Sequence, residues 1–175
     1  LPDSNLSLEE QRKKLDQTVY QNETLAQEYE QTFVRLWDQL RQARDPFEVL
    51  KSFPFNGLGV VKISNFESLP HGIQRAPLQE LKTNWSQDDL ATKLDQWSAE
   101  GYHLAQSEWH HEKFYSETSS TPAISLFKVE LHVRNERVNS RLIFRGSLEV
   151  TWASEKDPSG YATATFIRVR DAEVL

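Results

Sequence analysis

The chain has 175 residues, and its composition already excludes several classes of protein. It contains no cysteine, which rules out disulfides, thiolate metal sites and a cysteine nucleophile. Its 20 Lys and Arg residues stand against 26 Asp and Glu residues, so the formal net charge is −6 and the generally basic footprint of a nucleic-acid-binding protein is absent. No apolar run approaches the roughly 18 residues that a membrane span needs. An aromatic content of 11% favours a packed globule of one domain.

The beginning of the sequence indicates processing, because there is no Met anywhere and the first residue is Leu1. Two explanations are open: a secretory leader has been removed, or a domain has been separated from a larger protein. A strand predicted over residues 166–170 lies very near the last residue. We therefore expect a fragment of a larger, secreted or periplasmic bacterial protein. A cytoplasmic location is the alternative.

The first predicted element is a long helix. Ser7 and Glu10 match the S-x-x-E capping box, and no Pro or Gly follows before residue 45. Apolar residues then recur at spacings of three and four, as a helix requires: Leu15, Val19, Leu25, Tyr29, Phe33, Leu36, Trp37, Leu40. The first part is much more polar. We predict a disordered lead-in over residues 1–6, a polar helical extension over residues 1–24 that projects from the globule or packs on another copy, and a single domain over residues 25–175.

The middle of the chain shows shorter elements. Asp45 and Pro46 begin a short helix that Pro54 ends. Residues 58–63 (LGVVKI) predict a short strand, and residues 64–83 predict a loop with a second short strand near residues 73–81. Ser86 and Gly101 are the expected cap and stop of a third helix.

After Gly101 the hydrophobic period changes to two, which predicts four long antiparallel strands in a meander. The clearest strand is about 15 residues long, with these apolar residues on one parity: Val138, Leu142, Phe144, Leu148, Val150, Trp152. Strands of this length must bend to stay packed. Gly146 lies in the middle, where a kink or bulge is expected.

This order of helices and kinked strands resembles the NTF2-like (SnoaL-like) superfamily. The resemblance is carried by residues 33–40, 90–97 and 141–152 (RLIFRGSLEVTW). It implies an α+β fold in which N-terminal helices pack on a long antiparallel sheet curled into a cone, with an apolar cavity or a dimer surface as the functional feature. Residues 36–41 and 45–50 also resemble the amino-terminal region of secreted bacterial proteins that continue into FG-GAP/ASPIC-UnbV repeats.

The richest cluster of chemical groups lies on the first long strand. Alternation puts Glu108, His110 and Glu112 on one face, and Trp109, His111, Lys113 and Tyr115 on the other. Such groups can form an acid–base pair or a carboxylate–imidazole metal site. The alternative, which we favour, is a solvated strand face with ordinary histidines. No metal pattern is complete, so we predict neither a metal nor a cofactor.

Three functions follow as hypotheses. We favour a non-catalytic binding or assembly module whose pocket, formed by Tyr102, Trp109, His111 and Tyr115, takes a small apolar ligand. The alternative is a small-molecule enzyme of the cyclase, dehydratase or isomerase type that uses His111, Tyr115 and Glu108. A homodimerisation module without a ligand is the third. A pocket filled by Phe and Trp would count against the enzyme.

Basic residues gather in the predicted strands: Arg134, Arg137, Arg141, Arg145, Arg168, Arg170. They predict either a surface for an acidic partner or, as we favour, cross-strand ion pairs with glutamates on a solvent-exposed face of the sheet. His132 alternates with charged residues, which predicts that it is exposed.

Overall fold

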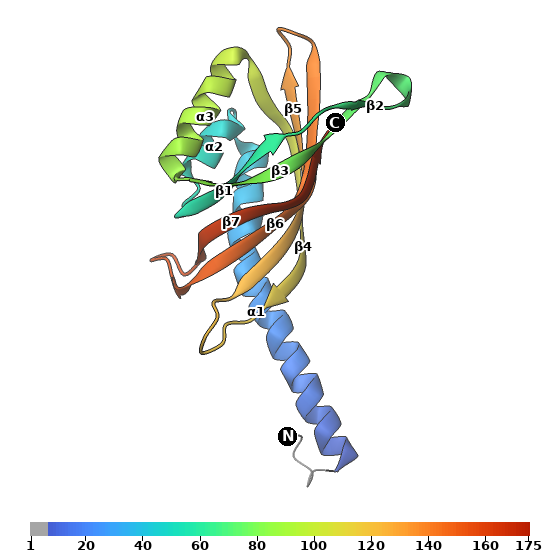
Figure 1. Ribbon diagram of the computed structural model, residues 1–175. Helices are drawn as coiled ribbons and strands as arrows, with labels where there is room; N and C mark the ends of the chain where they lie inside the picture. The colour runs from blue at the N-terminus through green and yellow to red at the C-terminus, as the bar shows by residue number, and fades with distance from the viewer. Residues whose placement is uncertain (1–6) are drawn as a thin grey trace.

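The computed structural model describes residues 7–175, so the disordered lead-in predicted for residues 1–6 lies outside the described residues. Within residues 7–175 the chain forms three α-helices, a 3-10 turn and seven strands (Figure 1). The helices are α1 (Leu8–Gln42), α2 (Pro46–Ser52) and α3 (Gln87–Glu100), and the 3-10 turn is Pro70–Gly72. The strands are β1 (Gly57–Ile63), β2 (Glu67–Ser68), β3 (Gln74–Trp85), β4 (Tyr102–Tyr115), β5 (Ile124–Asn135), β6 (Ser140–Lys156) and β7 (Ala162–Val174).

The seven strands form one mixed sheet in the order β2-β3-β1-β7-β6-β5-β4. The predicted antiparallel meander is confirmed for β4 to β7. β1 joins it through a short parallel pairing with β7, where Gly57 and Leu58 lie opposite Phe166 and Ile167. Figure 1 shows the sheet curling around the C-terminal half of α1. The predicted α+β class is therefore confirmed, and the curled sheet with helices packed on it is consistent with an NTF2-like cone.

Helix α1 is a single helix of 35 residues that begins at the predicted capping box. The amide of Glu10 donates to Oγ of Ser7, and the Glu10 carboxylate accepts from the amide of Ser7 at 2.9 Å. Its C-terminal half carries the buried residues Phe33, Leu36 and Leu40. The N-terminal half extends away from the sheet (Figure 1), and its side chains are exposed up to Leu25.

Aromatic rings form the centre of the core between α1 and the sheet. The ring of Phe33 lies 4.3 Å from that of Phe127, 5.3 Å from Trp109 and 5.9 Å from Trp152. Tyr29 extends this cluster, with its ring 5.4 Å from Trp152. Large aromatic side chains bury much area in such contacts, so this cluster anchors α1 in the hollow of the sheet.

Polar contacts hold the same helix against the β6–β7 hairpin. Oγ1 of Thr32 donates to the carbonyl of Ala162 at 2.7 Å, and Lys156 pairs with Glu28 at 3.1 Å. The guanidinium of Arg35 lies 4.7 Å from the ring centroid of Tyr161. Helix α1 is therefore held both on the inner face of the sheet and at the β6–β7 hairpin.

A bulge occurs at the predicted position along the sheet, but its extra residue belongs to β7, opposite Gly146, rather than to β6. The register of β6 and β7 moves from Arg145↔Glu173 to Ser147↔Arg170, so two β7 residues oppose Gly146. A Cβ atom on Gly146 would lie 2.5 Å from Cβ of Ala172, which only glycine avoids. A bulge of this kind bends the strand and increases its twist, and here it contributes to the curl of the sheet.

Within residues 64–83, the second strand predicted near residues 73–81 is confirmed, but it is longer than predicted and extends to Trp85. β3 is a strand of 12 residues that pairs antiparallel with β1, with Ile63 opposite Leu78 and Leu58 opposite Trp85. Pro77 lies within this strand although it has no amide proton to donate, and its carbonyl accepts from the amide of Ser64 at 2.9 Å. The long β3 provides hydrogen-bond partners for the backbone amides and carbonyls of β1, which would otherwise lack them.

The hairpin between β5 and β6 also differs from the prediction. β6 begins at Ser140, so Val138 lies in the turn and is exposed rather than on the buried parity. Asn139 has a φ of 48°, a turn conformation that Asn tolerates. The cap and stop of α3 are confirmed, with Ser86 as the N-cap and Gly101 at a φ of 101°.

Candidate functional site

A groove of about 1040 Å³ opens where the first half of β4 meets the C-terminal ends of α1 and α3. Its walls combine aromatic rings, guanidinium groups and polar side chains, chiefly from Trp37, Arg41, Arg44, Tyr102, His103 and Gln106. Volumes of this order are typical of small-molecule sites, in which apolar walls and a few polar groups fix the ligand. The groove is therefore the candidate site with the most suitable size and chemistry.

Two arginines give the groove an anion-binding character. The guanidinium of Arg41 lies 5.7 Å from the centroid of the Trp37 ring, within reach of a cation–π contact. Within residues 7–175, neither Arg41 nor Arg44 forms an ion pair. The carboxylate of Asp45, which also lines the groove, accepts from the amide of Phe47 and so caps α2. Both guanidinium groups can therefore meet an external anion.

The residues of the predicted pocket do not all lie together. Tyr102 and Glu108 line the groove. Trp109 and His111 pack on the inner side of the sheet, where their rings contact Phe33 and Phe127. The Tyr115 side chain is 54% exposed at the far end of β4.

A second bulge explains why Tyr115 is separated from His111. His111 lies opposite Phe127, but Lys113 lies opposite the neighbouring Leu126, so one residue of β4 is extra. The side-chain alternation reverses at this point. Phe114 turns inward against Tyr29, with the rings 5.0 Å apart, and Tyr115 turns outward. The predicted sharing of one face by His111 and Tyr115 was wrong for this reason.

Two inward polar atoms have no hydrogen-bond partner among residues 7–175. These are Nε1 of Trp109 and Nε2 of His111, both buried. The His111 ring stacks on Phe127 at 4.5 Å between centroids. Burial lowers the pKa of the His111 imidazole, and the nearby Glu30 carboxylate opposes that shift. The neutral imidazole is the form that this environment favours.

His132 differs from the sequence prediction, since only 9% of the residue is exposed. Its Nδ1 lies 2.6 Å from Nη2 of Arg141, and its Nε2 lies 2.5 Å from the carboxylate of Glu130. Because a guanidinium can only donate, Nδ1 accepts and the proton lies on Nε2. Alternation alone could not reveal this, because Arg141 reaches His132 from the neighbouring strand β6. Among residues 7–175, no three His, Asp or Glu residues are placed to hold a metal ion.

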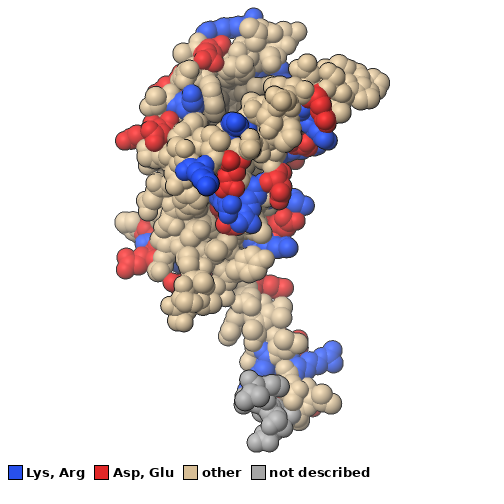
Figure 2. Space-filling model, viewed as in Figure 1, with Lys and Arg blue, Asp and Glu red and all other residues tan. Residues whose placement is uncertain are grey.

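The outer face of the sheet carries the predicted cross-strand ion pairs. Arg145 pairs with Glu173 at 2.6 Å, Arg170 with Glu149 at 2.9 Å, and Arg168 with Glu80. Figure 2 shows the resulting alternation of basic and acidic side chains across this face. The Arg168 guanidinium lowers the pKa of Glu80, as expected for a carboxylate that accepts charged hydrogen bonds. These arginines are paired within the chain, which removes the main argument for an acidic partner there.

Comparisons with known proteins do not assign this chain to a family. No family model matches the chain, and no curated protein matches it. Among solved structures, an NTF2-like protein of unknown function from Prochlorococcus marinus aligns with a TM-score of 0.38 and 12% sequence identity. The alignment covers 51% of this chain and 63% of that chain. The resemblance to FG-GAP/ASPIC-UnbV proteins has no support from these comparisons.

In the described part of the chain, no helix has both the length and the apolar character to cross a membrane.

Proposed function

We propose that this domain is a non-catalytic binding module, and that its ligand lies in the groove beside β4 rather than inside the curled sheet. The observation that supports this is the filling of the interior by aromatic rings, with Phe33 in ring contact with Phe127, Trp109 and Trp152. These rings occupy much of the interior next to His111, which favours a ligand site outside the curled sheet. The groove, in contrast, has about 1040 Å³ and is open to solvent at its mouth.

The groove favours a small organic anion that carries a flat apolar ring. Arg41 and Arg44 can hold a carboxylate, because a guanidinium presents paired donors that match its two oxygens. The rings of Trp37 and Tyr102 offer flat apolar surface in the same groove. This refines the small apolar ligand predicted from the sequence by adding an anionic group.

A matched pair of probes tests this proposal. Isothermal titration with 2-naphthoate and with uncharged 2-naphthamide separates the anionic contribution from that of the ring. We expect the naphthoate to bind at least tenfold more tightly, and we expect Arg44→Ala to remove most of that difference. Arg12→Ala, on the projecting part of α1, is the control with an unchanged affinity. Equal affinities for the two probes would contradict the proposed ligand class.

The second candidate is a small-molecule enzyme of the cyclase, dehydratase or isomerase type. One observation favours it: Nε2 of His111 and Nε1 of Trp109 are buried and have no hydrogen-bond partner in the described part of the chain, so they could hold a polar substrate. The other proposed catalytic residues do not meet His111, since Glu108 lines the groove and Tyr115 is exposed. Imidazole resonances of His111 distinguish the candidates. A substrate bound at His111 would shift them, whereas naphthoate in the groove would not.

The extracytoplasmic location, the larger chain and homodimerisation stay predictions of the sequence.

A further inference from the structure

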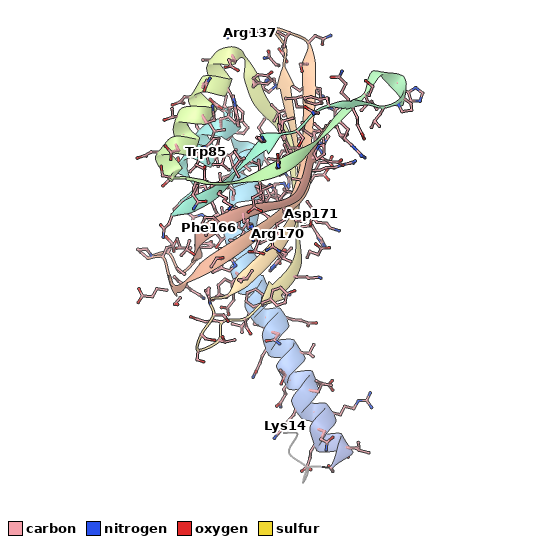
Figure 3. All side chains as sticks on the ribbon, viewed as in Figure 1. Lys14, Trp85, Arg137, Phe166, Arg170 and Asp171 are labelled. Atoms are coloured by element: carbon pink, nitrogen blue, oxygen red, sulfur yellow. The ribbon has the colours of Figure 1, made fainter. Side chains whose placement is uncertain are left out.

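The projecting half of α1 carries a stripe of apolar side chains that the described residues leave exposed. Leu8 is 85% exposed, Leu15 63% and Val19 48%. Figure 3 labels Lys14 in this half of the helix, far from the sheet. Exposed apolar side chains aligned on one face of a helix indicate a surface for a partner. We call this surface, formed by Leu8, Leu15, Val19 and Ala26, the α1 seam.

The α1 seam continues in phase with the buried face of the same helix. From Leu15 onward, stripe residues follow at alternating steps of four and three: Val19, Asn22, Ala26, Tyr29, Phe33, Leu36, Leu40. This spacing is the heptad repeat found on helices that pack side by side. The last four of these residues pack in the core, where Tyr29 meets Phe114 and Trp152. The first part is thus a helix-packing face of the same kind.

The two flanks of the α1 seam differ in charge. One flank carries Glu9, Asp16 and Glu23, each seven residues after the last. The other flank carries Gln11, Thr18 and Leu25, which are uncharged. Flanking residues of paired helices face each other and select the partner by charge. The acidic flank therefore requires basic residues on the helix that covers the seam.

A second copy of this chain does not meet that requirement. In an antiparallel pair, the acidic flank of one copy would face the acidic flank of the other, which is repulsive. In a parallel pair, the second helix would continue past Ala26 into the space where Tyr29 and Phe33 already meet the sheet. Both arrangements are disfavoured by residues that the structure shows.

We infer that the α1 seam docks an amphipathic helix of another protein segment, with Leu- or Val-like residues on its stripe and Lys or Arg along its flanks. Arg12 and Asn22 lie on the same stripe and give it polar points that fix the register of the partner. This inference is independent of the groove, which lies at the opposite end of α1.

Two synthetic helices test the inference. Both have three heptads with Val and Leu on the stripe, and they carry either Lys or Glu on both flanks. Fluorescence anisotropy with the full chain should show at least tenfold tighter binding of the Lys peptide. The triple variant Glu9→Lys, Asp16→Lys, Glu23→Lys should reverse this preference. Equal binding of the two peptides, or no binding of either at 100-fold the concentration of the chain, would overturn the inference.

A pair of variants separates docking from folding. Leu15→Ser with Val19→Ser should reduce binding of the Lys peptide at least tenfold, because it removes apolar area from the seam. Gln17→Ser with Gln21→Ser, on the opposite side of the same turns, should leave binding unchanged. Circular dichroism of both variants checks that α1 is still helical. Sedimentation of the wild-type chain as a dimer that Leu15→Ser with Val19→Ser dissociates would identify a second copy as the occupant and overturn the inference.

Discussion

The indole Nε1 of Trp152 donates a hydrogen bond to Oγ of Ser125 at 2.9 Å, and both side chains are buried. Trp152 lies at the centre of the aromatic core, next to Tyr29 and Phe33. A buried indole N–H that loses its acceptor retains its desolvation cost. The small hydroxyl of Ser125 therefore allows the largest side chain of the core to be buried without an unmet donor.

Replacing this acceptor should destabilise the fold. Ser125→Ala is expected to lower the free energy of unfolding by about 1–3 kcal/mol, measured by urea denaturation. Ser154→Ala is the matched control, since its hydroxyl donates to Glu117 on the exposed surface at 2.8 Å. We expect the control to change stability by less than about 0.5 kcal/mol. Equal decreases in the free energy of unfolding for both variants would show that the buried hydrogen bond contributes no more than an exposed one.

The bulge at Gly146 gives a second prediction. Gly146→Ala would place a methyl group 2.5 Å from Cβ of Ala172, so the two strands must separate. We expect a loss of about 1–3 kcal/mol in the free energy of unfolding, the usual cost of overpacking. Gly59→Ala is the control in the same sheet, because the nearest atoms to its added Cβ lie at 3.7 Å. A neutral Gly146→Ala would contradict the close approach of β6 and β7.

His111 should make stability depend on pH in a defined direction. Burial holds its folded-state pKa below the ordinary value of 6.5, so the unfolded chain takes up the proton first as the pH falls. The contribution of a neutral His111 is fully present above about pH 6.5 and is lost progressively below it. His111→Phe, which keeps an aromatic ring against Phe127, should lose less stability than the wild type between pH 8 and pH 5.

The measurement is urea denaturation at several pH values, in which only the difference between variants is compared. The exposed His71, which is not among the groups acting on His111, provides the control, since His71→Asn should keep the steeper wild-type dependence. Identical pH dependences of the wild type and His111→Phe would show that His111 is not held neutral by burial.

Local signals in the sequence predict most of the fold. Ser7, Ser86 and Gly101 mark helix ends through short-range hydrogen bonds and a positive φ, which depend on few neighbours. The period of two after Gly101 predicts the long strands, because each needs one buried face. Gly146 marks the position of the bulge, because glycine within a strand often indicates one. These features are encoded within a few residues of where they occur.

The candidate site is harder to predict because it depends on register between distant segments. One extra residue after His111 turns Tyr115 away, and no local pattern marks it. The groove joins Arg41 and Arg44 at the end of α1 to Tyr102 on β4, residues that are brought together only by the packing of α1 in the sheet. The burial of His132 likewise depends on Arg141 from the neighbouring strand.

The boundary predicted at residue 25 yields a last prediction. Residues 7–24 have exposed side chains and core contacts begin at Tyr29, so residues 1–24 should add little to folding stability. Deletion of residues 1–24 is expected to change the free energy of unfolding by no more than about 1 kcal/mol, the usual cost of losing an N-cap such as Ser7. Deletion of residues 1–34 also removes Tyr29 and Phe33, and it should abolish cooperative unfolding. Urea denaturation followed by near-ultraviolet circular dichroism measures both, since Trp152 reports on the core that α1 covers. Loss of cooperative unfolding in the shorter deletion would move the boundary of the domain into the projecting helix.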